Sequence, residues 1–293
     1  MTLTARFVAI FAVLLAPMAG AQQKIARRIA IDPEASIRIG NLPGNTRLIG
    51  WDKDSIAVAG TVPAGASFFF GGAGRGAKMG VERDEKSGTS SGTPMLEVRV
   101  PHGARVWVRS SEGWIEVEGM TGEVDLATVS GSIKVTGSLR LLTAETLDGN
   151  LEVTGPSQLT RVRTGGGRIT LSRVAGDLTV STVGGAVQLM EAAPGSARIE
   201  TVSGPVTYEG SLDRRSTLEI QTHSGDVELR LPQTVSGEFD FQSIDGTSQV
   251  ALSPKAGSPK PSKGKPLFFT AGGGGAHVVV RSFKGNIRLV SRD

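Results

Sequence analysis

Residues 124–135 read VDLATVSGSIKV, and this stretch decides the fold because two short alternating runs flank a Ser-Gly turn. Alternation of apolar and polar residues is the period of a strand with one buried face. Glycines in the same setting as Gly131 recur at positions 113, 131, 149, 167, 185, 204, 225, 246 and 285. Their successive spacings of 18, 18, 18, 18, 19, 21, 21 and 39 residues indicate a repeat protein.

Each repeat places four residues in apolar columns, two before its glycine and two after it. Only Thr160 and Ser248 put a polar side chain into these columns, which run from Val106 to Leu289. One repeat is too thin to bury its own apolar face, so repeats must stack with neighbouring strands about 4.8 Å apart. The pattern predicts an all-β fold, a parallel β-solenoid (β-helix) of about ten coils with 18–21-residue repeats, in the commoner right-handed form.

A serine or threonine stands three residues before each repeat glycine, as Thr128 does before Gly131. Its hydroxyl is close enough to the backbone to bond groups that the bend leaves unpaired. The glycine is expected to supply a positive φ where the chain turns between two faces. Both columns are therefore expected to serve the fold rather than a ligand.

Three other folds were weighed against the solenoid. A left-handed hexapeptide helix is excluded because its inward residues recur every six positions, whereas here the steps are two, seven and two. A β-sandwich needs a turn about every 8–12 residues, which the step from Gly113 to Gly122 satisfies, but it gives no reason for an 18-residue return. A calcium-binding roll needs G-G-x-G-x-D in successive repeats, and only Gly176-Asp177 and Gly225-Asp226 approach it.

Residues 1–21 have the pattern of a signal peptide. Arg6 is followed by a short apolar run over 7–15, and Ala19-Gly20-Ala21 has the small-x-small form of a cleavage site. The run is too short to span a bilayer, and no transmembrane segment is expected. The chain has no cysteine, which excludes a lipidated cysteine, disulfides and thiolate metal sites. We expect an exported protein in the periplasm or at the cell surface of a bacterium.

Three further segments are expected after the signal peptide. Residues 22–60 form an N-terminal cap and a degenerate first coil, and residues 61–93 are a Gly/Ser-rich insertion or long loop that carries Phe68, Phe69 and Phe70. Residues 94–293 form the regular solenoid, with an exposed basic Pro/Ser/Lys loop at 253–265. The last coil ends at 289, which leaves a terminal strand edge that needs capping or pairing.

Motifs for catalysis are scarce in this chain. The three histidines, His102, His223 and His277, have no metal-ligand spacing, and the outward columns contain no cluster of carboxylates. The formal net charge of +4 is spread over alternating signs, so it requires no nucleic-acid partner. We expect no enzyme, no metal and no cofactor; a polysaccharide-active β-helix enzyme is the alternative.

Two groups of residues are candidate ligand-binding sites. Trp107 and Trp114 both point outward near one turn of one coil, where sugar rings or a surface protein could contact them. The competing interpretation is that the 61–93 insertion folds back and covers both rings. A basic group on another coil could meet an anionic polymer, and it consists of Arg161, Arg163, Arg168 and Arg173.

The chain resembles the putative adhesin family of bacterial envelope proteins, which are β-strand repeat proteins of unknown function. The resemblance rests on LEVRVP at 96–101, VWVRSSEG at 106–113, GWD at 50–52 and the T-V-S-G phrases that begin at Thr128 and Thr201. It implies an exported, non-enzymatic β-solenoid that acts as an adhesin-like module on a cell-envelope glycan or surface protein. A structural scaffold of the envelope that self-associates end to end is the second hypothesis.

Overall fold

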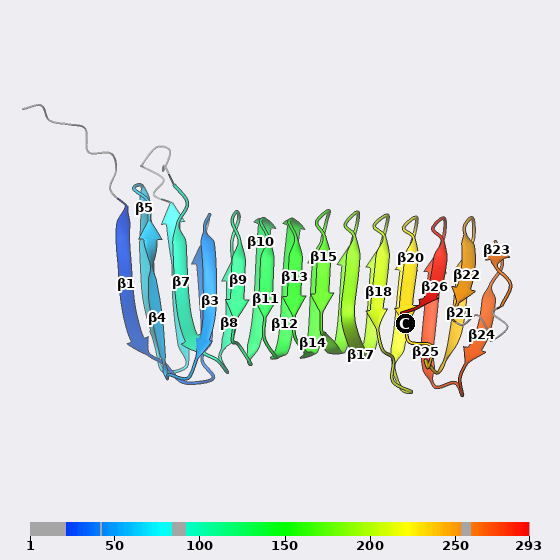
Figure 1. Ribbon diagram of the computed structural model, residues 1–293. Helices are drawn as coiled ribbons and strands as arrows, with labels where there is room; N and C mark the ends of the chain where they lie inside the picture. The colour runs from blue at the N-terminus through cyan, green and yellow to red at the C-terminus, as the bar shows by residue number, and fades with distance from the viewer. Residues whose placement is uncertain (1–21, 42, 84–91, 253–258, 293) are drawn as a thin grey trace, which may run out of the picture.

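The computed structural model describes residues 22–41, 43–83, 92–252 and 259–292, which form 26 strands and no helix (Figure 1). The prediction of an all-β fold is therefore confirmed. No helix in these four ranges is long and apolar enough to cross a membrane. The predicted signal peptide at 1–21 lies outside the described residues, as do 84–91 of the predicted insertion and 253–258 of the predicted basic loop.

The strands form two ladders that run the length of the array. Sheet A contains, in spatial order, β1 (Gln23–Ala30), β4 (Ser55–Val62), β7 (Met95–Pro101), β3 (Asn45–Trp51), β9 (Ile115–Glu118), β11 (Ile133–Thr136), β13 (Leu151–Thr154), β15 (Ile169–Ser172), the first half of β17 (Val187–Thr201), β18 (Val206–Gly210), β20 (Val227–Leu231), β26 (Ile287–Ser291), β22 (Thr247–Ala251) and β23 (Ser262–Lys263). Sheet B contains β5 (Ala66–Ala73), β6 (Gly76–Arg83), β2 (Ser36–Asn41), β8 (Arg105–Arg109), β10 (Glu123–Ser130), β12 (Leu139–Asp148), β14 (Ser157–Thr164), β16 (Ala175–Thr182), the second half of β17, β19 (Thr217–Thr222), β25 (Ala276–Ser282), β21 (Gly237–Ser243) and β24 (Leu267–Ala271).

The pairing is parallel through the repeats and antiparallel at both ends. In the repeats each strand pairs with its counterpart one repeat away, so that Val124 lies between Val106 and Leu142. At the N-terminal end β1 pairs antiparallel with β4, β4 with β7, and β5 with β6. At the C-terminal end β24 and β23 pair antiparallel with β21 and β22. The array is thus mixed, because strands that double back on themselves cover its two ends.

The coils do not stack in the order of the sequence. The coil of β25 and β26, last in the chain, lies between the coil of β19 and β20 and the coil of β21 and β22, and Figure 1 shows β26 beside β20. The expectation that the last coil forms a terminal edge is therefore wrong. The cap strands β23 and β24 occupy the outer edges of β22 and β21, so only the inner edges remain for the final coil.

The N-terminal end has the same arrangement. The coil of β2 and β3 lies inside, between β6 and β7 on one side and β8 and β9 on the other. Its register places Ile37 opposite Val106 and Leu48 opposite Val117, as the repeat phrase indicates. At both ends of the array, the coil that comes first or last in the sequence therefore lies between other strands and not at the end of the stack.

Residues 66–83 are strands and not the long loop that the sequence suggested. Strands β5 and β6 form an antiparallel hairpin that joins sheet B through β2. Ala77, Met79 and Val81 of β6 are buried, in the alternation of a strand with one face in the core. Phe68 and Phe70 pack against that core, so two of the three phenylalanines are part of the fold.

All four apolar columns are buried, which confirms the interior that the repeat predicts. The threonine and serine column is buried as well, and six of its hydroxyls accept a hydrogen bond from the glycine N–H three residues later, at 2.8–3.3 Å. These six residues are Thr164, Thr182, Thr201, Thr222, Ser243 and Ser282. The hydroxyls stabilise the turns, as the sequence suggested.

Most repeat glycines do not supply the positive φ that the sequence predicts. Of the nine repeat glycines only Gly113 and Gly131 have a positive φ. The others are needed because the turns stack closely: a Cβ on Gly185 would lie 1.9 Å from the carbonyl oxygen of Gly167 in the coil below. Distances of 1.7–2.0 Å to the carbonyl oxygen of the repeat glycine in the adjacent coil recur at Gly149, Gly167, Gly204, Gly225 and Gly285. Any side chain would force the coils apart.

Thr160 occupies a core column in place of an aliphatic residue, and its buried hydroxyl has no hydrogen-bond partner. Thr160→Val keeps the side-chain shape and removes the unpaired group, so we expect the free energy of unfolding to rise by about 1 kcal/mol. Chemical denaturation measures this change. Thr143→Val, on the outward face of the neighbouring strand β12, is the control, and an equal rise there would contradict the explanation.

Candidate functional site

An aromatic and basic surface lies on the outer face of sheet B at its N-terminal end. The register of β6, β2 and β8 places Lys78, Arg38 and Trp107 in one row across three neighbouring strands. All three point outward, because the residues on either side of each are buried. Phe69 on β5 completes the surface beside Lys78. We call Arg38, Phe69, Lys78 and Trp107 the aromatic–basic platform.

Cations in this region lie over the aromatic rings. The guanidinium carbon of Arg38 is 5.7 Å from the centroid of the Trp107 ring, and that of Arg105 is 6.0 Å from it. The ammonium of Lys78 lies 5.3 Å from the centroid of Phe69. Such contacts hold long basic side chains against the sheet and limit their rotamers. The platform is therefore partly ordered before any ligand arrives.

Two glycines form the floor beside these rings. Gly80 is buried beneath Phe69, and a Cβ added there would lie 2.9 Å from the ring and 2.0 Å from the carbonyl oxygen of Gly40. Gly40, on the neighbouring strand, has open space above it. No side chain therefore covers the backbone at Gly40, which leaves a shallow depression beside Phe69. A flat sugar ring or similar group could approach the backbone closely at this point.

Some charged side chains around the platform form ion pairs, and others do not. Arg105 pairs with Glu123, and Arg109 pairs with Asp125 at 2.9 Å. The hydrogen bond from Arg105 holds the pKa of Glu123 below its ordinary value, so this carboxylate stays charged and bound. Neither Arg38 nor Lys78 forms an ion pair with any described residue. The platform thus presents two cations that contact aromatic rings and have no carboxylate partner among the described residues.

The two predicted tryptophans lie in different places. Trp107 is half-buried on sheet B, in contact with arginine side chains and not with the phenylalanines of β5. Trp114 precedes β9, a strand of sheet A, and its backbone N–H donates to Asn45 Oδ1 at 3.0 Å. Trp107 projects from the outer face of sheet B, whereas Trp114 lies in the connection that leads into sheet A, so the two tryptophans do not share a strand face. Only Trp107 belongs to the platform.

The four predicted arginines are likewise spread around their coil. Arg161 and Arg163 lie on the outer face of sheet B, in the rows of Trp107 and Arg109, three strands farther along. Three strand spacings are about 14 Å. Arg168 and Arg173 lie in the turns at opposite ends of β15, and all four side chains are exposed. The structure therefore brings two of the four onto the face that carries the platform.

Sequence reasoning missed three platform residues. Arg38, Phe69 and Lys78 lie on β2, β5 and β6, and the sequence assigned the last two strands to a loop. The signal was present in the alternation of Ala77, Met79 and Val81, which places Lys78 on the outward face. Glycine-rich neighbours obscured that alternation.

A line of exposed apolar side chains also escaped the sequence analysis. It follows the buried hydroxyl column by one residue, and we call it the apolar ridge. The ridge holds six of the eight large apolar side chains that are exposed in the described residues: Val129, Leu147, Val183, Val202, Phe283 and Ile244. His223 occupies the same column and stacks on Phe283 with ring centroids 5.1 Å apart. Gly165 interrupts the line between Leu147 and Val183. Exposed apolar side chains gathered along one column are typical of a contact surface.

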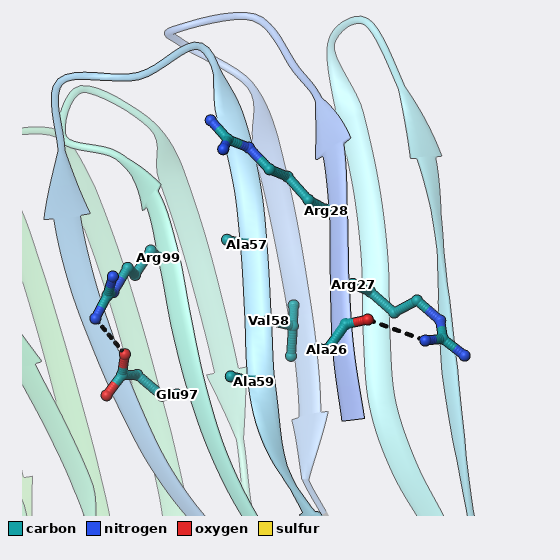
Figure 2. Close-up of a pocket in the computed structure, with 8 residues that line it drawn as sticks. All are labelled: Ala26, Arg27, Arg28, Ala57, Val58, Ala59, Glu97 and Arg99. Carbon is teal, nitrogen blue, oxygen red and sulfur yellow. Dashed lines mark hydrogen bonds and ion pairs between the residues drawn. The ribbon is translucent and has the colours of Figure 1, made fainter. Parts of the chain in front are cut away.

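A shallow hollow of about 430 Å³ lies on the outer face of sheet A at the same end (Figure 2). Three alanines line its floor: Ala26, Ala57 and Ala59. Arg99 pairs with Glu97 at 2.8 Å, whereas Arg27 and Arg28 donate to neutral groups, the Ala26 carbonyl oxygen at 2.9 Å and Ser55 Oγ at 3.0 Å. The residues that line the hollow include no aromatic ring, so it lacks the stacking surface of the platform.

The histidines do not gather at any site. His102 Nδ1 lies 3.2 Å from Asp52 Oδ1 at the surface, and His223 stacks on Phe283. His277 is on β25, beside Thr217 of the neighbouring strand. Within the described part of the chain, no group of three or more His, Cys, Asp or Glu side chains could hold a metal ion.

Comparison with known proteins gives one family and several solved structures. The family model Toastrack DUF4097 matches residues 52–289. No curated protein matches the chain. Solved structures similar to it include a putative cell adhesion protein from Clostridium sporogenes ATCC 15579, with 9% identity, coverage of 92% of this chain and 100% of that chain, and a TM-score of 0.25.

Two further structures are similar over the same share of this chain. A putative lipid binding protein from Parabacteroides distasonis ATCC 8503 is 12% identical, with 92% of this chain and 98% of that chain covered and a TM-score of 0.45. A putative adhesin from Bacteroides fragilis NCTC 9343 is 11% identical, with 92% and 97% covered and a TM-score of 0.41.

Proposed function

Because the chain belongs to the Toastrack DUF4097 family, we propose that it is a non-catalytic, adhesin-like binding module of the bacterial cell envelope. The aromatic–basic platform is its binding site, and an anionic glycan is its ligand class. One observation carries this proposal: Arg38 and Lys78 are exposed, without carboxylate partners among the described residues, beside Trp107 and Phe69.

The chemistry of the platform suits an acidic sugar. Aromatic rings such as Trp107 stack against the apolar faces of sugar rings, and guanidinium and ammonium groups bind carboxylate or sulfate oxygens. The platform is a flat sheet surface and not an enclosed cavity, which favours a polymer over a small molecule. Arg161 and Arg163, about 14 Å along the same rows, would meet the next negative groups of an extended chain.

The finer features of the proposal rest on the sequence pattern together with the ladders. Paired residues on neighbouring strands are 18 to 21 positions apart in the sequence, which supports a parallel β-solenoid of about ten coils with rigid outer faces. The signal-peptide pattern at 1–21 supports export to the periplasm or cell surface. A rigid face suits binding, because little conformational entropy is lost when the ligand docks.

Trp107→Ala is expected to weaken binding to an acidic polysaccharide at least about tenfold, because loss of an aromatic anchor costs about 2 kcal/mol. Binding is measured by co-sedimentation with alginate, with neutral dextran as the reference and across a salt series. Arg38→Ala is expected to weaken the same binding and to reduce its dependence on salt.

Trp114→Ala is the matched control, since this half-buried tryptophan precedes a strand of sheet A. It is expected to leave alginate binding unchanged. If Trp114→Ala abolished binding while Trp107→Ala did not, the platform would be the wrong surface. Equal binding of the unaltered chain to alginate and dextran would also contradict an anionic ligand.

A further inference from the structure

The apolar ridge lies in the turns that lead from sheet B to sheet A, and in Figure 1 these turns lie side by side along one edge of the array. Its six large apolar side chains are 39–67% exposed. Seven strand spacings separate its first position from its last, so the ridge is about 34 Å long. In the order that the strand ladders give, its eight positions are Val129, Leu147, Gly165, Val183, Val202, His223, Phe283 and Ile244.

The ridge has one gap and one bulge, and both lie at the same distance from its middle. The gap is Gly165, the third position, which carries no side chain. The bulge is His223, the sixth position, whose ring stacks on Phe283 with the centroids 5.1 Å apart. The middle of the ridge falls between Val183 and Val202. When one ridge is reversed against another about this point, each gap lies opposite a bulge.

The charges beside the ridge obey the same symmetry. Asp148, Lys284 and Asp245 each follow a ridge residue; all three are exposed, and none forms an ion pair with a described residue. Reversal places Asp148, in the second coil of the ridge, opposite Lys284 in the seventh. Asp245, which neighbours Lys284 in the adjoining coil, falls opposite the uncharged Ser130. The whole column reads Ser130, Asp148, Gly166, Gly184, Ser203, Ser224, Lys284 and Asp245.

We propose that the chain forms an antiparallel dimer in which the apolar ridges of two copies pack against each other. The twofold axis is perpendicular to the sheets, so it reverses the order of the coils and leaves each column of turn residues opposite the same column of the second copy. Val183 then packs on Val202 of the partner subunit at the centre of the contact. Asp148 lies opposite Lys284 of the partner subunit, and the symmetry makes this charge pair twice.

Only one register combines these features. A shift by one coil in one direction brings Asp148 opposite Asp245 of the partner subunit, and a shift in the other direction brings Asp245 opposite Glu112 of the partner subunit. Like charges that face each other across an interface disfavour it. A twofold axis along the array would instead oppose each coil to its own copy, so the gap would stay empty and the two bulges would meet.

The dimer has a consequence for binding that rests on the proposed function. The same twofold axis keeps both copies of sheet B on one side, so the dimer presents two aromatic–basic platforms there, near its opposite ends. A polymer long enough to reach both platforms binds as a bivalent ligand, and its second contact is intramolecular. The dimer contact itself includes no residue of the platform.

Sedimentation velocity over a wide concentration range tests the dimer. The contact is limited to one edge of each array, and small interfaces bind weakly and reversibly, so the unaltered chain is expected to pass from monomer to dimer as its concentration rises. Val183→Glu places a carboxylate at the apolar centre of the contact and is expected to weaken dimerisation at least about tenfold. Thr179→Glu, on the exposed outer face of the same coil, is the control and should dimerise as the unaltered chain does.

Charge reversal tests the register. Asp148→Lys and Lys284→Asp each oppose like charges at both symmetric contacts, so each variant alone is expected to dimerise more weakly. A mixture of the two restores both charge pairs and is expected to form the mixed dimer. Glu152→Lys makes the same charge change in the coil of Asp148, on the outer face of sheet A, and should leave dimerisation unchanged.

Three results would overturn the proposal. The first is an unaltered chain that stays monomeric at every concentration; if that monomer floated with phosphatidylcholine vesicles, the ridge would belong to a lipid surface. The second is a Val183→Glu variant that keeps the thermal unfolding and the dimerisation of the unaltered chain. The third is a mixture of the two charge variants that associates no better than either alone.

The ridge variants retain Arg38 and Trp107, so the proposed function is measured separately on them. An alginate oligosaccharide too short to reach two platforms is expected to bind the Val183→Glu monomer and the unaltered dimer with the same affinity per chain. Loss of the dimer with this binding intact, or the reverse, shows which of the two proposals has failed.

Discussion

Replacing Gly185 by alanine is expected to be strongly destabilising. A Cβ at this position would lie 1.9 Å from the carbonyl oxygen of Gly167, and the obstacle is backbone that belongs to the neighbouring turn. Relief requires the two coils to separate, which also breaks the hydrogen bonds from the backbone N–H groups of Val183 and Gly184 to the carbonyl oxygen of Gly165, at 3.1 and 3.0 Å. We expect the free energy of unfolding to fall by about 3 kcal/mol, measured by chemical denaturation.

The adjacent Gly184 provides a matched control. A Cβ there meets Ser203 Oγ at 3.7 Å, an ordinary van der Waals contact, and Gly184 does not have a positive φ. Gly184→Ala is therefore expected to change stability by less than about 1 kcal/mol. If both alanines destabilised the protein equally, close stacking of the turns would not be the reason for the glycine column.

Removal of residues 276–293 is expected to unfold a further segment of the chain, residues 237–271, as well. Strand β21 pairs only with β25 and β24 in the described structure, and β22 pairs only with β26 and β23. Without the final coil, residues 237–271 have no strand to join. Limited proteolysis of the truncated chain is expected to cleave within 233–275 while residues 105–231 stay protected.

The size of this effect follows from burial. Val278, Val280, Ile287 and Leu289 are all at most 1% exposed, and each apolar side chain of this kind contributes about 1.5–3 kcal/mol. The point variant Leu289→Ala is expected to cost about 2–5 kcal/mol, whereas Val290→Ala, half-buried on the other side of the strand, costs less. Protection of 237–271 in the truncated chain would show that the coils follow sequence order.

The interior of the molecule could be predicted because every coil repeats the same local chemistry. Alternation fixed which residues point inward, so even the degenerate coil beginning at Ile37 aligned with Val106 in the observed register. The resemblance to envelope repeat proteins was likewise recognisable from the T-V-S-G phrases, and the Toastrack DUF4097 match confirms it. Period-two alternation carries this information without any knowledge of long-range contacts.

The order of the coils could not be read in the same way. Val227 pairs with Ile287, 60 positions later, although Ser248 occupies the same column 21 positions later. Coils of one repeat offer nearly identical apolar faces, so the stacking energy differs little between neighbours. The 39-residue spacing between Gly246 and Gly285 indicated an inserted segment. It did not indicate which coils the following coil would pack between.

The candidate site was predictable in part, for a geometric reason. Trp107 was correctly placed outward because its two neighbours are core residues. Trp114 and Arg168, which lie in the connections before β9 and β15, were grouped with residues of sheet B. That grouping fails because proximity along a coil does not imply a shared face. The companions of Trp107 come from strands 69 and 29 positions earlier, as the pairing of Arg38 with Trp107 and with Lys78 shows. Only the sheet brings them together.

The buried position of the last coil also constrains how the chain folds. Coils of a repeat protein can form by extension from a folded neighbour, but extension beyond β20 requires β26, whose residues follow those of β21 to β24 in the chain. The segment 232–275 therefore stays unpaired until β26 has docked. Closing this loop loses conformational entropy before new contacts stabilise it. The chain therefore completes its C-terminal end from the inside outward, with β21 and β22 docking after the strands that follow them in sequence.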